Sequence, residues 1–226
     1  MKATVPVWGD CRETLPCSRR WSSARQHAAL AGPLSTTTPA QEVDAVIREE
    51  LFPTSEELTM GEVMQQLNEI TQGEAVIVSD VGQHQMVACR YAPQNQSRSH
   101  VTSGGLGTMG FALPAAIGAK FGAPDRPVVA VIGDGGFQMT IQELGTIMQS
   151  GVDVKIIILN NQFLGMVRQW QELFHQRRYS FVDIQSPDFV AVAAGYRIAG
   201  QRVDARPDLR PALEKMLAHP GSFCWK

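Results

Sequence analysis

Three short runs of apolar, mostly β-branched residues constrain the fold of this chain most strongly. They cover residues 75–78, 127–132 and 154–159. Apart from Lys155, each run is continuously apolar, which is typical of strands that are covered on both faces of a sheet. Helical patterns follow or separate them at residues 82–91, 109–121, 140–150 and 165–176. The alternation predicts an α/β domain with a doubly wound, mostly parallel sheet flanked by helices and joined by right-handed crossovers.

Further helices are expected outside this central region. One is predicted at residues 59–71, another begins at the Pro-Asp-Phe sequence of residues 187–189 and ends near Gly195, and a last one covers about 207–219. Residues 1–56 show no sustained apolar periodicity and contain a Ser/Thr/Pro run at 33–39. Only a short helix at 42–50 is expected there, because Pro53 stops its continuation. We therefore expect a poorly ordered segment at 1–56 and one folded domain at 57–226.

Composition excludes several classes of protein. The chain has 20 Lys and Arg against 22 Asp and Glu, a net charge of −2, and no basic stripe that would indicate a nucleic-acid surface. It has no apolar run near the roughly 18 residues of a membrane span and no signal-peptide pattern at its first residues. Its four cysteines lack metal spacing and are expected to be free thiols in a reducing cytoplasm; they are Cys11, Cys17, Cys89 and Cys224.

Polar and glycine residues gather where the predicted strands end. They occupy residues 80–84, 133–136 and 160–161, and a glycine-rich loop at 103–110 lies between the first two strands. Ligands of open parallel sheets bind beyond the carboxyl ends of the strands. We therefore expect the ligand site of this chain to be built from these four segments.

The loop at 105–110 is a literal GxGxxG sequence. One interpretation is a dinucleotide fingerprint, with a pyrophosphate on the following helix N-terminus and Asp134 on a ribose. The alternative is a glycine turn that packs a helix against a strand. The preceding stretch, 99–102, is short and polar, and this favours the turn.

Asp134 and the pair Asn160-Asn161 form a second and stronger pattern. Asp134 lies between glycines at a strand end, and 24 residues separate Gly135 from Asn160 at the end of the next strand. Each motif alone is common in turns, but adjacent parallel strands bring the two together. A carboxylate, an amide oxygen and a loop carbonyl suit Mg²⁺, which completes its six oxygen ligands with water or phosphate. The pair predicts a metal–diphosphate site.

With its neighbours, this pattern resembles the thiamine-diphosphate-binding motif, and more closely the catalytic subunit of acetohydroxyacid (acetolactate) synthases. The resemblance is densest between about residues 60 and 204. It rests on residues 80–86 (DVGQHQM), 102–110 (TSGGLGTMG), 113–119 (LPAAIGA) and 164–170 (LGMVRQW), besides Asp134 and Asn161.

The resemblance implies roles for individual residues. Mg²⁺ would be bound by Asp134, the side chain of Asn161 and the carbonyl of Phe163, where the family often has another residue type. Met109 would wedge between the two cofactor rings, and Trp170 would line the substrate channel. Taken alone, His84, Met109 and Trp170 are more often packing residues. The residues implied to contact thiamine diphosphate are Gln83, His84, Gly107, Thr108, Met109, Asp134, Gly135, Gly136, Asn161, Gly165 and Met166.

The family resemblance also implies parts that this sequence does not match. The family has three domains, including a central one that carries FAD and a pyrimidine-binding one whose glutamate activates the cofactor in the partner subunit. Residues 1–56 are interpreted as a remnant of the central domain and linker, and the FAD site is absent. Residues 221–226 depart from the pattern where the family continues into a further strand and tail, so truncation at the C-terminus is expected.

The resemblance predicts an enzyme of branched-chain amino-acid synthesis that decarboxylates pyruvate and joins the product to a second 2-oxo acid. It also implies a homodimer or higher oligomer, with a possible regulatory small subunit. The chain alone is expected to be inactive. Another thiamine-diphosphate carboligase or decarboxylase, such as a glyoxylate carboligase, is the first alternative. A non-catalytic module that binds cofactor or pairs with other subunits is the second.

Overall fold

A computed structural model of the chain describes residues 51–54, 57–92 and 95–226. The helix expected at 42–50 and nearly all of the segment expected to be poorly ordered lie outside these residues. The division into 1–56 and 57–226 stays a prediction.

Six strands form one sheet in which all neighbouring strands are parallel, as the apolar runs predicted. The order across the sheet is β2-β1-β3-β4-β6-β5. The chain therefore leaves β1 toward one edge and returns to its other side with β3, so the topological switch point lies between β1 and β3. The strands are β1 (Val76–Ser79), β2 (His100–Val101), β3 (Val128–Gly133), β4 (Lys155–Leu159), β5 (Ala199–Gln201) and β6 (Phe223–Trp225).

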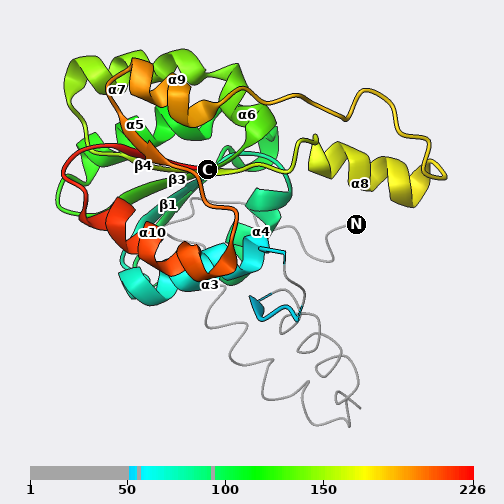
Figure 1. Ribbon diagram of the computed structural model, residues 1–226, viewed down its shortest axis with the longest axis horizontal. Coiled ribbons are helices and arrows are strands. Elements are labelled where there is room, and N and C mark those ends of the chain that lie inside the picture. The colour runs from blue at the N-terminus through cyan, green and yellow to red at the C-terminus, as the bar shows by residue number, and fades with distance from the viewer. Residues whose placement is uncertain (1–50, 55–56, 93–94) are drawn as a thin grey trace, which may run out of the picture. The chain divides into compact units, whose positions relative to one another are not determined.

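Helices cover both faces of the sheet, as Figure 1 shows. On one face α5, α6, α7 and α9 form one hydrophobic core together with Val128, Ala130 and Ile132 of β3. On the other face α3, α4 and α10 form a second hydrophobic core together with Val129 and Val131 of the same strand. The helices are α3 (Met60–Thr71), α4 (Gln83–Tyr91), α5 (Ala112–Gly122), α6 (Asp134–Met139), α7 (Leu144–Ser150), α8 (Gly165–Phe174), α9 (Phe189–Gly195) and α10 (Arg206–Ala218).

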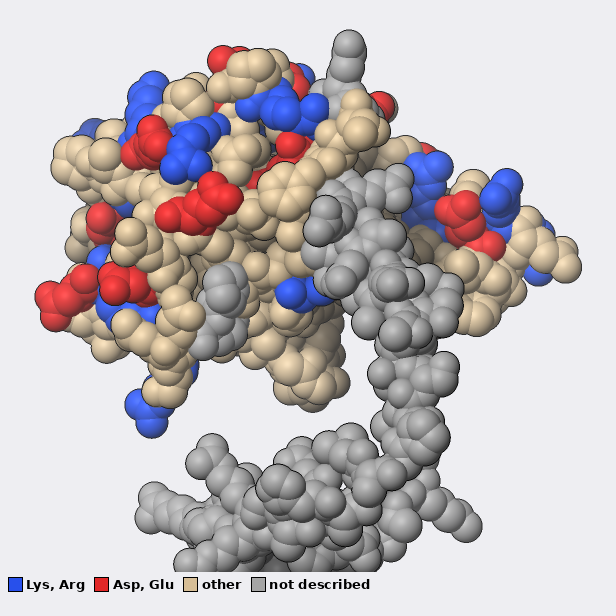
Figure 2. Space-filling model, turned by 90° about the horizontal axis from the view of Figure 1, so that it is seen from below, with Lys and Arg blue, Asp and Glu red and all other residues tan. Residues whose placement is uncertain are grey.

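Helix α8 differs from the others because none of its residues is buried. It projects from the domain to the right in Figure 1. On the face seen in Figure 2, basic and acidic side chains are interspersed over the domain and over this projection. No helix in the described part of the chain is long and apolar enough to cross a membrane.

Three expectations from the sequence need correction. Asp134 was expected in a glycine turn at a strand end, but it begins α6, which is held by Phe137 packing edge-to-face on Phe189 at 5.2 Å. The helix expected from Met109 begins only at Ala112, because Gly110 has a φ of +81°. No strand was predicted at 221–226, yet 223–225 form β6, buried between β4 and β5; the expected truncation of the family pattern stays a prediction.

Lys155 ties the end of the chain to the centre of the sheet. It is 3% exposed, and its Nζ donates to the carbonyls of His219 and Gly221 at 2.7 and 2.6 Å and pairs with Asp153 at 2.7 Å. Two carbonyls and one carboxylate therefore surround the ammonium group, and the two hydrogen bonds fix the turn that leads into β6.

We expect Lys155→Ala to lower the free energy of unfolding by about 3 kcal/mol, because the substitution leaves buried carbonyls without a donor. Lys215→Ala, at an exposed lysine that donates to the Oε1 of Gln201 at 3.0 Å, is the control and should change it by no more than about 0.5 kcal/mol. Urea unfolding of the two variants measures the difference. Equal effects would show that the buried lysine is dispensable.

Candidate functional site

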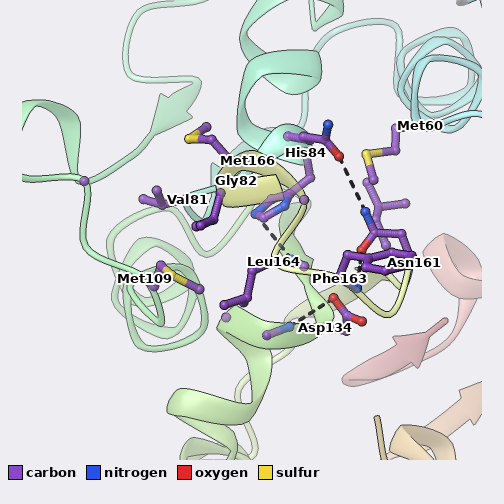
Figure 3. Close-up of a pocket in the computed structure, with 18 residues that line it drawn as sticks. Met60, Val81, Gly82, His84, Met109, Asp134, Asn161, Phe163, Leu164 and Met166 are labelled. Carbon is purple, nitrogen blue, oxygen red and sulfur yellow. Dashed lines mark hydrogen bonds between the residues drawn. The ribbon is translucent and has the colours of Figure 1, made fainter. Parts of the chain in front are cut away.

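A pocket of about 150 Å³ lies at the carboxyl ends of β1, β3 and β4, beside the topological switch point. Open α/β sheets bind their ligands at this position. Of the residues predicted to form the site, all but Thr108 and Trp170 line it (Figure 3). They are Gln83, His84, Gly107, Met109, Asp134, Gly135, Gly136, Asn161, Phe163, Gly165 and Met166.

Asp134, the first residue of α6, is 1% exposed. Its Oδ1 accepts the N–H of Gly135 at 3.0 Å, and its Oδ2 accepts the N–H of Gln162 at 2.9 Å and the hydroxyl of Ser186 at 3.1 Å. Burial raises the pKa of Asp134 above its ordinary value, although these hydrogen bonds oppose the shift. A desolvated carboxylate of this kind is stabilised by a bound cation.

Asn161 and Phe163 lie beside Asp134 at one side of the pocket, whereas Met109 lies at the other (Figure 3). The Oδ1 of Asn161 accepts the N–H of Phe163 at 3.1 Å, and its Nδ2 lies 3.5 Å from the Oε1 of Gln83. These contacts turn the chain after β4 so that it faces Asp134.

The predicted ligand set suits Mg²⁺ because all of its donors are oxygen atoms and only one of them is charged. Asp134 supplies the carboxylate, and the amide of Asn161 and the carbonyl of Phe163 supply neutral oxygens. The described residues contain no group of three or more His, Cys, Asp or Glu side chains that could hold a metal instead. The predicted set leaves Mg²⁺ to take its remaining ligands from phosphate or water, as it commonly does.

Glycines let the segments of the site approach one another closely. A Cβ at Gly135 would lie 2.7 Å from the Cδ2 of Leu164, and a Cβ at Gly165 would lie 2.9 Å from the Nδ2 of Asn161. Real Cβ atoms do not make contacts this short. A larger side chain at these two positions would therefore displace the side chains of Leu164 and Asn161.

His84 is buried at the start of α4 with 4% exposure. Its Nε2 accepts the N–H of Gly133 at 3.3 Å, so the neutral ring carries its proton on Nδ1. Burial lowers the pKa of His84 from 6.5 to about 4. His84 is therefore an uncharged support for the strand end before Asp134, while its neighbour Gln83 bonds Gln169 at 3.3 Å and faces Asn161.

The glycine-rich loop is anchored by Asp80, which is fully buried. Its Oδ2 accepts the N–H of Gly110 at 3.1 Å and its Oδ1 accepts that of Ala112 at 3.3 Å. Burial raises the pKa of Asp80, and these backbone bonds oppose the shift. A protein carboxylate thus occupies the N-terminus of α5, where the dinucleotide interpretation required a pyrophosphate, and the glycine-turn alternative is favoured.

The structure does not bring Trp170 or Thr108 to the pocket. Trp170 is 57% exposed on α8 and stacks on Phe174 with ring centroids 5.0 Å apart. Thr108 lies between two lining residues, and its N–H bonds the Oγ of Ser103 at 2.9 Å. The roles of both residues stay predictions.

Eight residues at the site had no predicted role of their own. Ser186 bonds Asp134 from outside the pocket, and the other seven line it: Met60, Val81, Gly82, Gly133, Leu159, Leu164 and Val167. Val81 and Leu164 adjoin residues that were predicted, so proximity in sequence could have indicated them. Nothing in the sequence around Ser186 signals its contact, which depends on the path of the chain after α8.

The comparisons agree with this geometry. Residues 80–224 match the family described as thiamine pyrophosphate enzyme, C-terminal TPP binding domain. The match covers more than half of the chain, and the chain belongs to this family.

The relatives are more specific. The chain is 43% identical over 162 residues to the acetolactate synthase isozyme 2 large subunit of Escherichia coli (strain K12), which covers 71% of this chain and 30% of that protein. It is 39% identical over 206 residues to the acetolactate synthase large subunit of Lactococcus lactis subsp. lactis (strain IL1403), which covers 90% of this chain and 35% of that protein. It is 46% identical over 162 residues to the acetolactate synthase large subunit of Cyanidium caldarium, which covers 71% of this chain and 27% of that protein. The chain thus spans about a third of the length of these relatives.

The pKa of His84 predicts a pH dependence of stability. Between pH 6.5 and about 4 the unfolded chain binds a proton at His84 that the folded chain does not. Stability therefore falls as the pH is lowered through this window, by about 3 kcal/mol in all for this residue.

Urea unfolding at pH 7 and pH 4 measures this loss. His84→Gln, which keeps an acceptor near the N–H of Gly133, should lose less stability than the wild type between the two values, because the contributions of Asp80 and Asp134 are common to both. An identical loss in both proteins would contradict the assignment of a neutral, buried His84.

Proposed function

We propose that this chain provides the Mg²⁺- and diphosphate-binding half of an acetolactate synthase active site. The observation that carries the proposal is the convergence of segments after β1, β3 and β4, together with the loop at 104–110, on one pocket containing Asp134 and Asn161. The relatives with this sequence pattern are named acetolactate synthase large subunits. The proposed reaction decarboxylates pyruvate and joins the two-carbon product to a second 2-oxo acid in branched-chain amino-acid synthesis.

The residues of the pocket divide by what they would hold. Asp134, the amide oxygen of Asn161 and the carbonyl of Phe163 would bind Mg²⁺. The glycines at 135, 136 and 165 let the backbone approach the diphosphate, with Gln83 and His84 beside it. Thiamine diphosphate supplies carbanion stabilisation when bound, and Gly107, Thr108 and Met109 orient its rings.

The alternatives have less support. A different thiamine-diphosphate carboligase or decarboxylase, such as a glyoxylate carboligase, is disfavoured by the names of the relatives at 39–48% identity. Met166 and Trp170, which lie in the segment that resembles the synthases, also favour an acetolactate synthase over a glyoxylate carboligase. The assays described below distinguish the proposed function from that of a non-catalytic cofactor-binding module.

The size of the pocket supports a site that is completed by further protein. About 150 Å³ is below the roughly 300–1,000 Å³ of most ligand pockets. We infer a homodimer or higher oligomer in which a pyrimidine-binding domain covers the open side, with FAD held by a central domain outside the described residues. The large-subunit names of the relatives support a regulatory small subunit, and a cytoplasmic location is part of the proposal.

The first test is binding of thiamine diphosphate by calorimetry with and without Mg²⁺. Asp134→Asn should weaken Mg²⁺-dependent binding at least about 100-fold, because it removes the charged ligand of the metal. Asp188→Asn is the matched control, since Asp188 caps α9 and asparagine caps equally well. Unchanged affinity in a folded Asp134→Asn protein would contradict the site.

The second test concerns turnover. We expect this chain alone to form no acetolactate from pyruvate with Mg²⁺, thiamine diphosphate and FAD, because no glutamate is among the described residues that line the pocket. General acid–base participation contributes about 10²–10⁴-fold in rate, and a missing wall of the pocket admits water. A colorimetric acetoin assay measures the product. Turnover near that of an intact synthase would show that the acid is present in this chain.

A further inference from the structure

Ser186 lies in the stretch between α8 and α9 and contacts the proposed metal site from outside the pocket. Its Oγ is 3.1 Å from the Oδ2 of Asp134 and 3.3 Å from the Oδ1 of Asn160. A hydroxyl has one proton to donate, so the Oδ2 of Asp134 and the Oδ1 of Asn160 share it. Ser186 therefore joins the end of β4 to the start of α6 at the point where both present ligands.

The contact makes the two oxygens of Asp134 unequal. Oδ2 accepts hydrogen bonds from two other segments, through Gln162 and Ser186, whereas Oδ1 accepts the N–H of the adjacent Gly135. A carboxylate oxygen with two protein donors has little remaining capacity for a cation. Oδ1 is the oxygen left available to a metal, and the donors on Oδ2 fix the rotation of the carboxylate that presents it.

Backbone pairing explains how a residue so far along the chain reaches Asp134. The N–H of Leu164 donates to the carbonyl of Val182 at 2.8 Å, and the N–H of Ile184 donates to that of Gln162 at 3.0 Å. These bonds form an antiparallel bridge between Phe163 and Asp183. The segment 164–182, which contains α8 and is called the α8 excursion below, thus begins and ends on this bridge, and Ser186 lies three residues after Asp183.

We propose that Ser186 is a positioning residue that orients the carboxylate of Asp134 for Mg²⁺ and so couples metal binding to the closure of the α8 excursion on the bridge. The inference rests on the proposed function, because it requires Asp134 to be a metal ligand. Outer-shell hydrogen bonds to metal ligands typically contribute 10–100-fold in metal affinity. Ser186 does not itself touch the metal or the cofactor.

The test is the Mg²⁺ concentration that gives half-maximal binding of thiamine diphosphate, followed by calorimetry or tryptophan fluorescence. Ser186→Ala should raise this concentration by about 10–100-fold, while at saturating Mg²⁺ the affinity for thiamine diphosphate returns to within a few-fold of wild type. Ser186→Thr, which keeps the hydroxyl, should restore the wild-type requirement. A purely structural role would lower cofactor affinity at every Mg²⁺ concentration and would not be rescued at saturation.

Ser180→Ala is the matched control, because Ser180 belongs to the same excursion but bonds Gln171 through its backbone. Ser186→Cys, which keeps the volume and weakens the donor, gives the same readout if the alanine variant does not fold. An unchanged Mg²⁺ requirement in Ser186→Ala or Ser186→Cys, with normal binding by the wild type, overturns the inference alone. Absence of Mg²⁺-dependent binding by the wild type overturns the proposed function and this inference with it.

Discussion

The site depends on the parallel register of β1, β3 and β4. Gly133 and Leu159, the last residues of β3 and β4, pair with each other, and Ser79, the last residue of β1, pairs with Val131. The three strands therefore end within two residues of one another beside the switch point. The residues that follow them then face one another without any long loop to bring them together. A shift of one strand by one residue would exchange its two buried faces, and Asp134 and Asn161 would no longer share a pocket.

Burial of polar groups is the second feature on which the site is built. Asp80, His84 and Asp134 are each at most 4% exposed, and each is held by backbone N–H groups from another segment. Asp80 fixes the loop that carries Met109, and His84 fixes the strand end before Asp134. The carboxylates thus have directional support, yet Asp134 keeps a raised pKa, which a cation at the pocket would lower.

The sequence predicts the central part of this fold because continuous apolar runs alternate with helical patterns. It also predicts most of the pocket, since parallel strands bring Asp134 and Asn161 to one edge. It does not predict α6, whose six residues include two glycines and are held by the packing of Phe137. Nor does it predict β6, which is three residues long, or Ser186, whose contact requires a backbone bridge that no local pattern encodes. Trp170 is placed on an exposed helix, where only contacts with other protein could give it a role at the site.

The most direct test of this account is the position of the metal itself. Mn²⁺ replaces Mg²⁺ at oxygen sites and can be located by anomalous diffraction in crystals of the chain grown with thiamine diphosphate. The account predicts one Mn²⁺ peak in contact with Asp134 and Asn161, with the diphosphate beside the glycines of α6. An ordered cofactor in another pocket, or a Mn²⁺ ion bound away from Asp134, would contradict it.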